Sequence, residues 1–200
     1  MHASLCDQLL DLVQNSLEAG ATQVAVTFFE TAEVLEAGVR DNGCGMSEEV
    51  QRRALDPFFS GGGKHRHRKV GLGLAFLKQM VDATGGMLML SSAPGEGTAI
   101  TFRLVISHPD VPPAGDLPTA WTAMMVFDGD YELTVDRRLG DSGYRIGRRE
   151  LADALGELET ATSIAMVKDY AASQEEALKM QKGLEHGSTD IGGAADAARE

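Results

Sequence analysis

The chain has 200 residues, of which 43% are hydrophobic and 24% charged, the composition of an ordinary globular protein. No apolar run reaches the ~18 residues needed to cross a bilayer, and polar residues interrupt the N-terminal segment too often for a signal peptide. We therefore expect no membrane partner and a cytoplasmic location. The two cysteines, Cys6 and Cys44, are too few for a disulfide framework.

Negative charge is spread unevenly along the chain. The net charge of −12 argues against general nucleic-acid binding. Residues 1–107 carry 9 Lys and Arg against 12 Asp and Glu (net −3), whereas residues 108–200 carry 9 against 18 (net −9). The near-neutral first half is the better place for an anionic ligand.

The first half of the chain predicts alternating helices and strands. Residues 4–19 have an apolar arc at helical spacing, with Gly20 as a candidate C-cap. Further helices are predicted at 47–55 and 71–86, and strands at 22–30, 34–40, 87–92 and 98–106. These elements predict a two-layer α/β (α+β) sandwich, in which about three helices cover one face of a mixed four-stranded sheet.

A boundary follows the last of these strands. Residues 108–118 hold four of the six prolines and predict a linker or an extended crossover. Beyond it, TAMMVFDGD and YELTVDRRL suggest a hairpin, with a further short strand at GYRI. Residues 148–182 predict helix, broken near Gly156 or Thr160, and the small polar residues of 183–200 predict disorder. The region 119–182 could form an appended core, a homodimer interface or a groove for a partner; the core is the commonest role for scattered apolar helical positions.

Polar residues on the first helix could act on a phosphorylated ligand. Asp11 and Asn15 are four residues apart and so share one helical face. A carboxylate there could orient or deprotonate a water, and an amide oxygen could help to bind Mg²⁺. Taken alone, this pattern is better explained as a solvated polar face.

The glycine-rich segment DNGCGM, Asp41 to Met46, follows the second predicted strand. Asp41 could accept a hydrogen bond from an exocyclic amine, while Gly43 and Gly45 would let a flat ring approach the backbone. A turn-forming aspartate among glycines is an equally good explanation.

Residues 56–70 predict a long loop with a basic cluster from Lys64 to Lys69. Gly71 and Gly73 follow at the start of a helix, where free N–H groups favour phosphate. A basic cluster at this position in an acidic protein favours a lid over phosphates, although most charge runs are only solvated surface. Gly63 and Lys64 precede His65 instead of Ser or Thr, so this is no Walker A loop.

The fourth segment is GEGTAITF, in which Thr98 opens a strand after a glycine turn. Its hydroxyl could reach the edge of a base, directly or through water, although a β-branched residue needs no such role in a strand.

In this order, the four segments resemble the GHKL superfamily of ATPases and kinases over residues 4–106. DLVQNSLEAGAT is similar to the corresponding MutL stretch, and DPFFS, GLGLAFLKQMVDATGG and SSAPGEGTAITFRL are similar to bacterial histidine kinases. The resemblance implies a Bergerat-type sandwich over residues 1–107, with ATP and Mg²⁺ as ligands.

The resemblance also implies roles for single residues. Asn15 matches the Mg²⁺-binding asparagine, Asp41 the adenine-selecting aspartate, and Thr98 the threonine that supports it. The base, lid and phosphate segments of the family match the remaining candidates: Gly43, Gly45, Met46, Phe58, Phe59, Lys64, Gly71, Leu72, Gly73 and Leu74.

Two departures from the family limit these implications. Hydrolysing members carry a general-base glutamate where this chain has Asp11, which is one methylene shorter, so any hydrolysis is expected to be slow. Almost nothing precedes the first helix, where histidine kinases carry their phosphoacceptor histidine, so we do not expect ordinary autophosphorylation. The leading hypothesis is a stand-alone Mg-ATP-binding module that phosphorylates or regulates a partner protein. The alternatives are an ATP-dependent conformational switch and a slow ATPase with Asp11 as its base.

Overall fold

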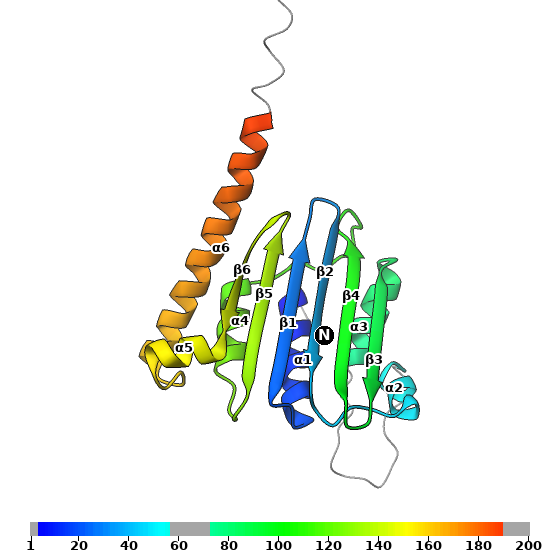
Figure 1. Cartoon of the computed structure of the whole chain (residues 1–200). Helices are drawn as coiled ribbons and strands as arrows, with labels where there is room; N and C mark the ends of the chain where they lie inside the picture. Colours follow the sequence, from blue (N-terminus) through cyan, green and yellow to red (C-terminus); the bar gives the residue numbers. More distant parts are fainter. Residues whose placement is uncertain (1–3, 57–72, 190–200) are drawn as a thin grey trace, which may run out of the picture.

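The computed structural model of the chain describes residues 4–56 and 73–189, and side chains as far as residue 182. A six-stranded sheet with the order β3-β4-β2-β1-β5-β6 forms its centre (Figure 1). Strands β1 and β5 run parallel, and the other neighbours are antiparallel. The strands are β1 Gln23–Glu30, β2 Val34–Asp41, β3 Met87–Ala93, β4 Gly97–Val105, β5 Glu132–Leu139 and β6 Ser142–Gly147.

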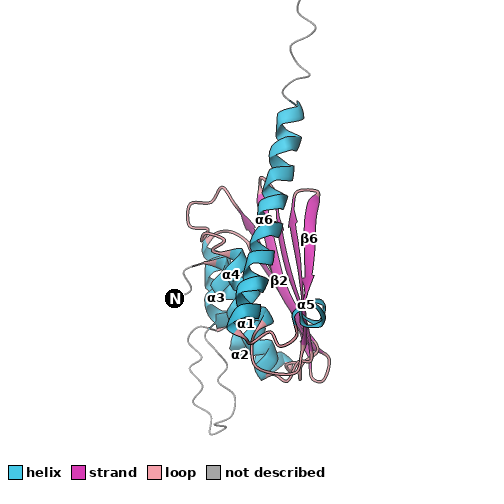
Figure 2. Ribbon diagram, turned by 90° about the vertical axis from the view of Figure 1, so that its left-hand side faces the viewer, coloured by secondary structure: helices cyan, strands magenta, loops and turns pink. Residues whose placement is uncertain are grey.

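The helices lie mainly on one face of this sheet. Figure 2 shows α1, α3 and α4 as a layer beside the strands, and Figure 1 shows the opposite face of the sheet without a covering helix. Helix α6 packs against α4 and the β6 edge and extends past the end of the sheet. The helices are α1 Leu5–Glu18, α2 Glu48–Ala54, α3 Gly73–Ala83, α4 Leu117–Met125, α5 Arg148–Leu155 and α6 Ala161–Thr189.

Helix α1 begins with a capping box. The Ser4 side chain accepts a hydrogen bond from the Asp7 backbone N–H, and the Asp7 carboxylate accepts one from the Ser4 backbone N–H. The apolar side of the helix, which includes Leu5, Leu9 and Val13, is completely buried against the sheet. Its polar side is left to form the candidate site.

One continuous hydrophobic core joins the first half of the chain to the second. Strand β5 pairs with β1 along its full length, with Val135 opposite Val26. The indole of Trp121 on α4 packs edge-on against Phe28, with 6.0 Å between ring centroids, and both side chains are fully buried. Residues as far along as Ala171 belong to the same buried cluster as Leu5.

The structure confirms the predicted sandwich and its four N-terminal strands, but the sheet has six strands. The C-terminal hairpin adds β5 and β6 beside β1, because β1 would otherwise leave one edge unpaired. The predicted linker also has contacts of its own: the carbonyls of Pro113 and Ala114 accept hydrogen bonds from the backbone N–H groups of Leu5 and Cys6, at 3.0 and 2.9 Å.

The expectation of a strand at TAMMVFDGD was wrong. Residues as far as Met125 belong to helix α4, and the hairpin is instead formed by β5 and β6. Asp116 caps this helix by accepting a hydrogen bond from the Thr119 N–H, and Pro118 occupies its first turn. The apolar run fits a helix because Trp121, Met124 and Met125 share one buried side.

The expected break near Gly156 is confirmed, because α5 ends at Leu155 and α6 begins at Ala161. The tail predicted to be disordered, residues 183–200, is described only as far as Thr189, where α6 ends. Residues 190–200 lie outside the described part.

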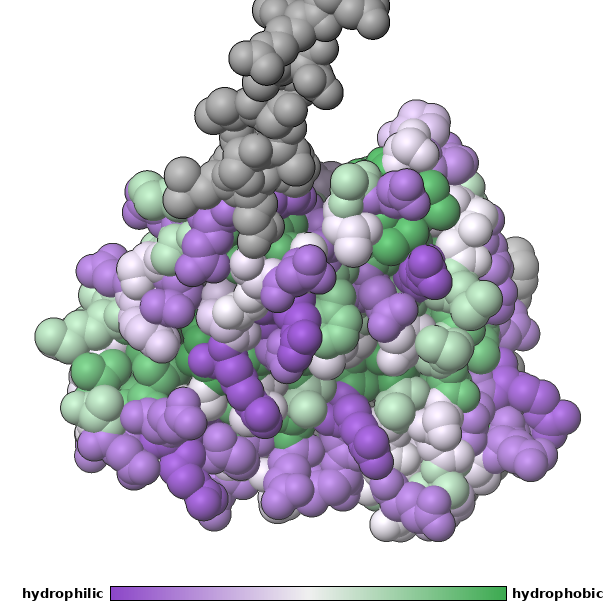
Figure 3. All heavy atoms as spheres, turned by 45° about the horizontal axis from the view of Figure 1, so that its top comes forward, coloured by the Kyte–Doolittle hydropathy of each residue, from purple (hydrophilic) through white to green (hydrophobic). Residues whose placement is uncertain are grey.

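The surface mixes polar and apolar side chains. Figure 3 shows apolar residues in separate patches among hydrophilic ones. The most exposed large apolar side chains include Met87 and Met89, on edge strand β3. Within the described residues, no helix combines the length and apolar character needed to cross a bilayer.

Candidate functional site

Asp11 and Asn15 meet on the polar side of α1, as their spacing predicts. The Asn15 Nδ2 donates a hydrogen bond of 3.2 Å to the Asp11 Oδ2, and both residues are half-buried. This bond orients the amide so that its oxygen stays available as an acceptor or a metal ligand. The pair is therefore a half-buried polar feature of α1 and not a fully solvated surface.

Asp41 lies at the end of β2 and is held by two donors. The Ser16 Oγ donates to its Oδ2 at 2.8 Å, and the Gly43 backbone N–H donates to its Oδ1, also at 2.8 Å. Each carboxylate oxygen has a second lone-pair direction. Asp41 can thus accept a further hydrogen bond from a ligand while the protein fixes its orientation.

Of the glycines after Asp41, Gly45 is required by the backbone and Gly43 is closely packed. Gly45 has φ of 63°, and a Cβ at this position would collide with the Ala93 carbonyl oxygen. Gly43 lies within close reach of Ala19 and of the Asp41 carboxylate. The structure shows close approach between segments of the chain here, so the two glycines have a structural role whether or not a base lies over them.

Ser92 connects this loop to the start of β4. Its Oγ accepts a hydrogen bond from the Met46 N–H at 2.8 Å and lies 2.8 Å from the Gly97 carbonyl and 2.9 Å from the Thr98 Oγ1. Thr98 is the cross-strand partner of Asp41. The threonine hydroxyl therefore lies in the same region as Asp41, but the bond recorded for it goes to Ser92.

The start of α3 lies directly against α1. A Cβ on Gly73 would overlap the Asp11 Oδ2, so the carboxylate occupies the space that a side chain at 73 would need. Gly73 and Leu74 are both buried. The structure thereby brings Asp11, Asn15 and the first turn of α3 together, next to Asp41 through the neighbouring residue Ser16.

The remaining candidates lie outside the described residues. These are Phe58, Phe59, Lys64, Gly71 and Leu72, together with the rest of the basic cluster.

Sequence reasoning missed the polar residues that hold the site in place. Ser16 bonds both Asp41 and the Leu12 carbonyl, and Gln51 donates from its Nε2 to the carbonyls of Ser92 and Met46, at 2.7 and 3.1 Å. A serine within a helix and a glutamine on a short helix carry no local signal of such contacts. They act across 25 and 41 positions of sequence.

The sequence of this part of the chain matches a known family of ATPase domains. The sequence profile of the histidine kinase-, DNA gyrase B- and HSP90-like ATPases matches residues 3–108, more than half of the chain. The chain belongs to this family. The profile ends just after β4, so the region from α4 onward lies outside the matched part of the ATPase domain.

The relatives of this ATPase domain include several sensor kinases. The sensor histidine kinase WalK of Bacillus subtilis is 37% identical over 105 residues, which cover 48% of this chain and 17% of WalK. The virulence sensor protein BvgS of Bordetella bronchiseptica is 35% identical over 104 residues, covering 48% of this chain and 8% of BvgS. The matched region thus spans less than a fifth of either relative. Among solved structures, the mycobacterial sensor histidine kinase MprB is 26% identical with a TM-score of 0.38, covering 49% of this chain and 67% of that one.

Proposed function

We propose that this chain binds Mg-ATP in the site formed by α1, the end of β2 and the start of α3, and that it transfers the γ-phosphoryl group to a partner protein. The family supports ATP binding and kinase-type signalling. The observation that carries the site assignment is Asp41, a half-buried carboxylate held by Ser16 and Gly43 with acceptor capacity to spare. A cytoplasmic location belongs to the same proposal.

The residues around Asn15 fit a magnesium ion. The Asn15 Oδ1 and the Asp11 carboxylate are hard oxygen donors on adjacent turns of one helix. Among the described residues, no three His, Cys, Asp or Glu side chains come together as a metal cage. This suits Mg²⁺, which commonly binds through one or two protein oxygens together with phosphates and water. When bound, it would neutralise phosphate charge during transfer.

We favour phosphoryl transfer over hydrolysis because Asp11 has only one oxygen, Oδ1, left to orient a water. Its Oδ2 accepts a hydrogen bond from Asn15 and packs against Gly73, which leaves this oxygen little room for an attacking water. Transfer mainly requires positioning and charge neutralisation, and a partner would supply the acceptor group. A slow ATPase with Asp11 as base, and an ATP-dependent switch without turnover, remain the alternatives to be tested.

The nucleotide site is tested by replacing Asp41. We expect Asp41→Asn to weaken ATP binding at least about tenfold, because it converts one fixed acceptor oxygen into a donor. Isothermal titration calorimetry with Mg-ATP measures this change. Asp153→Asn, an exposed site on α5, removes the same charge and should leave the affinity unchanged. Equal affinities for the Asp41→Asn variant and the unaltered chain would rule out the assignment.

A second experiment separates the three activities. The chain is incubated with γ-labelled ATP and a lysate of its source. Label on a second protein supports transfer, whereas free phosphate that disappears in Asp11→Asn supports hydrolysis. Nucleotide binding with neither product supports the switch and contradicts transfer.

A further inference from the structure

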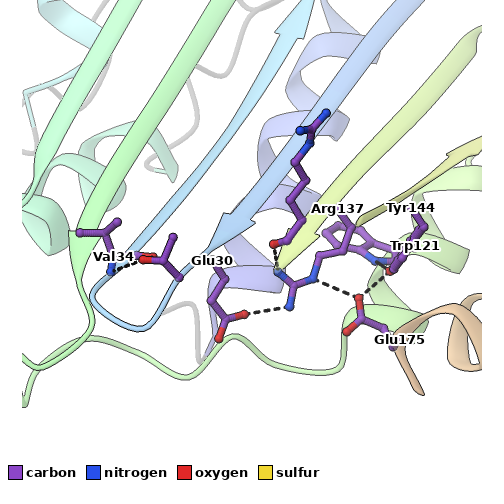
Figure 4. A network of polar contacts seen from close by, with 8 residues as sticks. Glu30, Val34, Trp121, Arg137, Tyr144 and Glu175 are labelled. Carbon is purple, nitrogen blue, oxygen red and sulfur yellow. Dashed lines mark hydrogen bonds and ion pairs between the residues drawn. The ribbon is translucent and has the colours of Figure 1, made fainter. Parts of the chain in front are cut away.

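The C-terminal region carries a buried polar network that ends in an unsatisfied carboxylate oxygen. Arg137 on β5 lies between Glu30 and Glu175, with contacts of 2.8 and 3.1 Å (Figure 4). The Tyr144 hydroxyl also donates to the Glu175 Oε1 at 2.6 Å. The other oxygen, the Glu175 Oε2, is buried without a hydrogen-bond partner among the described residues. A buried carboxylate oxygen without a donor costs free energy, so this position favours any ligand that supplies one.

Glu175 also lines a groove between the start of α4 and the second half of α6. The groove has a volume of about 600 Å³. Its walls include apolar surface from Leu117, Pro118, Ala172 and Met180, which suits a chain of methylene groups. At 3% exposure, Glu175 is the most deeply buried of the charged residues that line it.

The charged residues around the groove favour a ligand of positive charge. Its lining contains three carboxylates, Asp116, Glu175 and Glu176, against the single ammonium of Lys179. The network behind the groove leaves this excess unchanged, because the charges of Arg137 and Glu30 cancel and Glu175 is already counted. An anion would meet this charge unfavourably, whereas a cation would find both an attractive field and an unused acceptor.

We propose that this groove binds the side chain of an arginine or lysine from a partner protein. The aliphatic stem would lie along the apolar wall, and the guanidinium or ammonium group would pair with Asp116 and Glu176 at the rim. Because the Glu175 Oε2 is itself buried, donation to it requires the side chains that cover it to move aside. The groove is formed by residues 115–118 and 172–180, far along the chain from the nucleotide site. None of these residues belongs to the proposed nucleotide site, so the proposal does not rest on ATP binding.

The test uses the whole ¹⁵N-labelled chain and two matched peptides. One is acetyl-GSRLSG-amide, and the other carries citrulline, the neutral isostere of arginine, in place of the arginine. We expect the arginine peptide to shift the amide signals of residues 115–118 and 172–180 and the citrulline peptide to bind about tenfold more weakly or not at all. Equal binding by the two peptides, or no shift at about 10 mM peptide, overturns the proposal.

Variants of α6 establish that the groove itself is responsible. Glu176→Gln should weaken the arginine peptide several-fold, and Lys179→Met should strengthen it, because that change removes the competing cation. Asp169→Asn removes an equal charge from an exposed position of the same helix outside the groove and should change nothing. If Asp169→Asn weakens binding as much as Glu176→Gln, the attraction is only the general acidity of the chain and the groove is excluded.

Two further measurements address the buried oxygen and the source of the cation. Glu175→Gln keeps an acceptor for Arg137 and Tyr144 but places an amide NH₂ at the unsatisfied position, so it should abolish peptide binding while the spectrum stays that of a folded chain. Unchanged binding in this folded variant means that water satisfies Oε2 and contradicts the proposed contact.

Agmatine, a free guanidinium compound, should bind to the groove more weakly than the arginine peptide does. Equal affinity of agmatine and the peptide would point to a small organic cation as the ligand and overturn the assignment to a protein partner.

Discussion

The proposed nucleotide site centres on a carboxylate, Asp41, whose direction is fixed by the protein itself. Asp41 uses one lone pair on each oxygen for Ser16 and Gly43, so it loses little freedom when it accepts a third hydrogen bond. The same contacts tie α1 to the end of β2. A site of this kind depends on the residues that orient the binding group as much as on the group itself.

Ser16→Ala should therefore weaken the site without unfolding it. The change leaves Asp41 with its Gly43 bond only, and alanine favours the helix, so we expect about a fivefold to tenfold loss of ATP affinity and less than about 1 kcal/mol of lost stability. Calorimetry and urea denaturation measure the two effects. Ser173→Ala, an exposed site on α6, is the matched control and should alter neither. An unchanged affinity in Ser16→Ala would show that Asp41 needs no such support.

Cys6 provides a test of burial through its titration. Burial, with a smaller contribution from Asp7, raises the pKa of the thiol from 9.0 to about 12. The unfolded thiol ionises near pH 9 while the folded one stays protonated, so this group lowers stability as the pH rises from about 9 towards about 12.

We expect the unaltered chain to lose about 1.4 kcal/mol more stability than Cys6→Ala between pH 8 and pH 10. Urea denaturation at the two pH values gives the change in the free energy of unfolding for each protein. Subtracting the change in Cys6→Ala from that in the unaltered chain removes the effect of other groups that titrate in this range. Equal losses would show that the thiol is accessible in the folded chain.

At the scale of the elements, the contact between α1 and α3 depends on the smallness of one residue. Gly73→Ala would drive a methyl group into the Asp11 carboxylate, and we expect a loss of about 1–3 kcal/mol. The double variant Asp11→Ala with Gly73→Ala should recover most of it, because alanine at 11 vacates the space. Urea denaturation of the two single variants and the double gives the coupling. Additive losses would mean that the two residues do not touch.

The elements also show how far the sequence determines this fold. The first four strands and their helices could be predicted because each carries its own apolar period and its own glycine signals, as at Gly20 and Gly45. Helix α4 could not, because the run ending at Met125 suits a strand as well as a helix, and its cap, Asp116, lies inside a proline-rich stretch that favours a linker. The pairing of β5 with β1 is a long-range contact that no local pattern encodes.

The candidate site likewise contains residues that motifs predict and residues that only the tertiary structure reveals. Asp11, Asn15, Asp41 and Gly73 were predicted from motifs, and the structure gathers them around one end of α1. Ser16 and Ser92 were not, since a serine hydroxyl bonds whatever the fold brings near it. Motifs therefore indicate which groups could contact a ligand, whereas the tertiary structure determines what orients them.

At the scale of the whole molecule, the region after β4 is integrated into the sandwich through Arg137. This side chain is 2% exposed, reaches Glu30 on β1 and Glu175 on α6, and lies 5.0 Å from the Phe28 ring centre. Trp121 joins the same network by donating from its Nε1 to the Tyr144 hydroxyl at 2.9 Å. One cation thus connects the first strand, the fifth strand and the long C-terminal helix.

Removing this cation should destabilise the entire chain. Arg137→Met leaves Glu175 buried without its counter-ion, so we expect a loss of about 3–5 kcal/mol. The adjacent Arg138→Met is the matched control: its side chain is 59% exposed, and we expect less than about 1 kcal/mol. Urea denaturation followed by fluorescence of Trp121, the single tryptophan, reports directly on this part of the core. Similar losses in Arg137→Met and Arg138→Met would show that the second half of the chain is held by apolar packing alone. In that case the double variant Arg137→Met with Glu175→Leu should be no more stable than Arg137→Met.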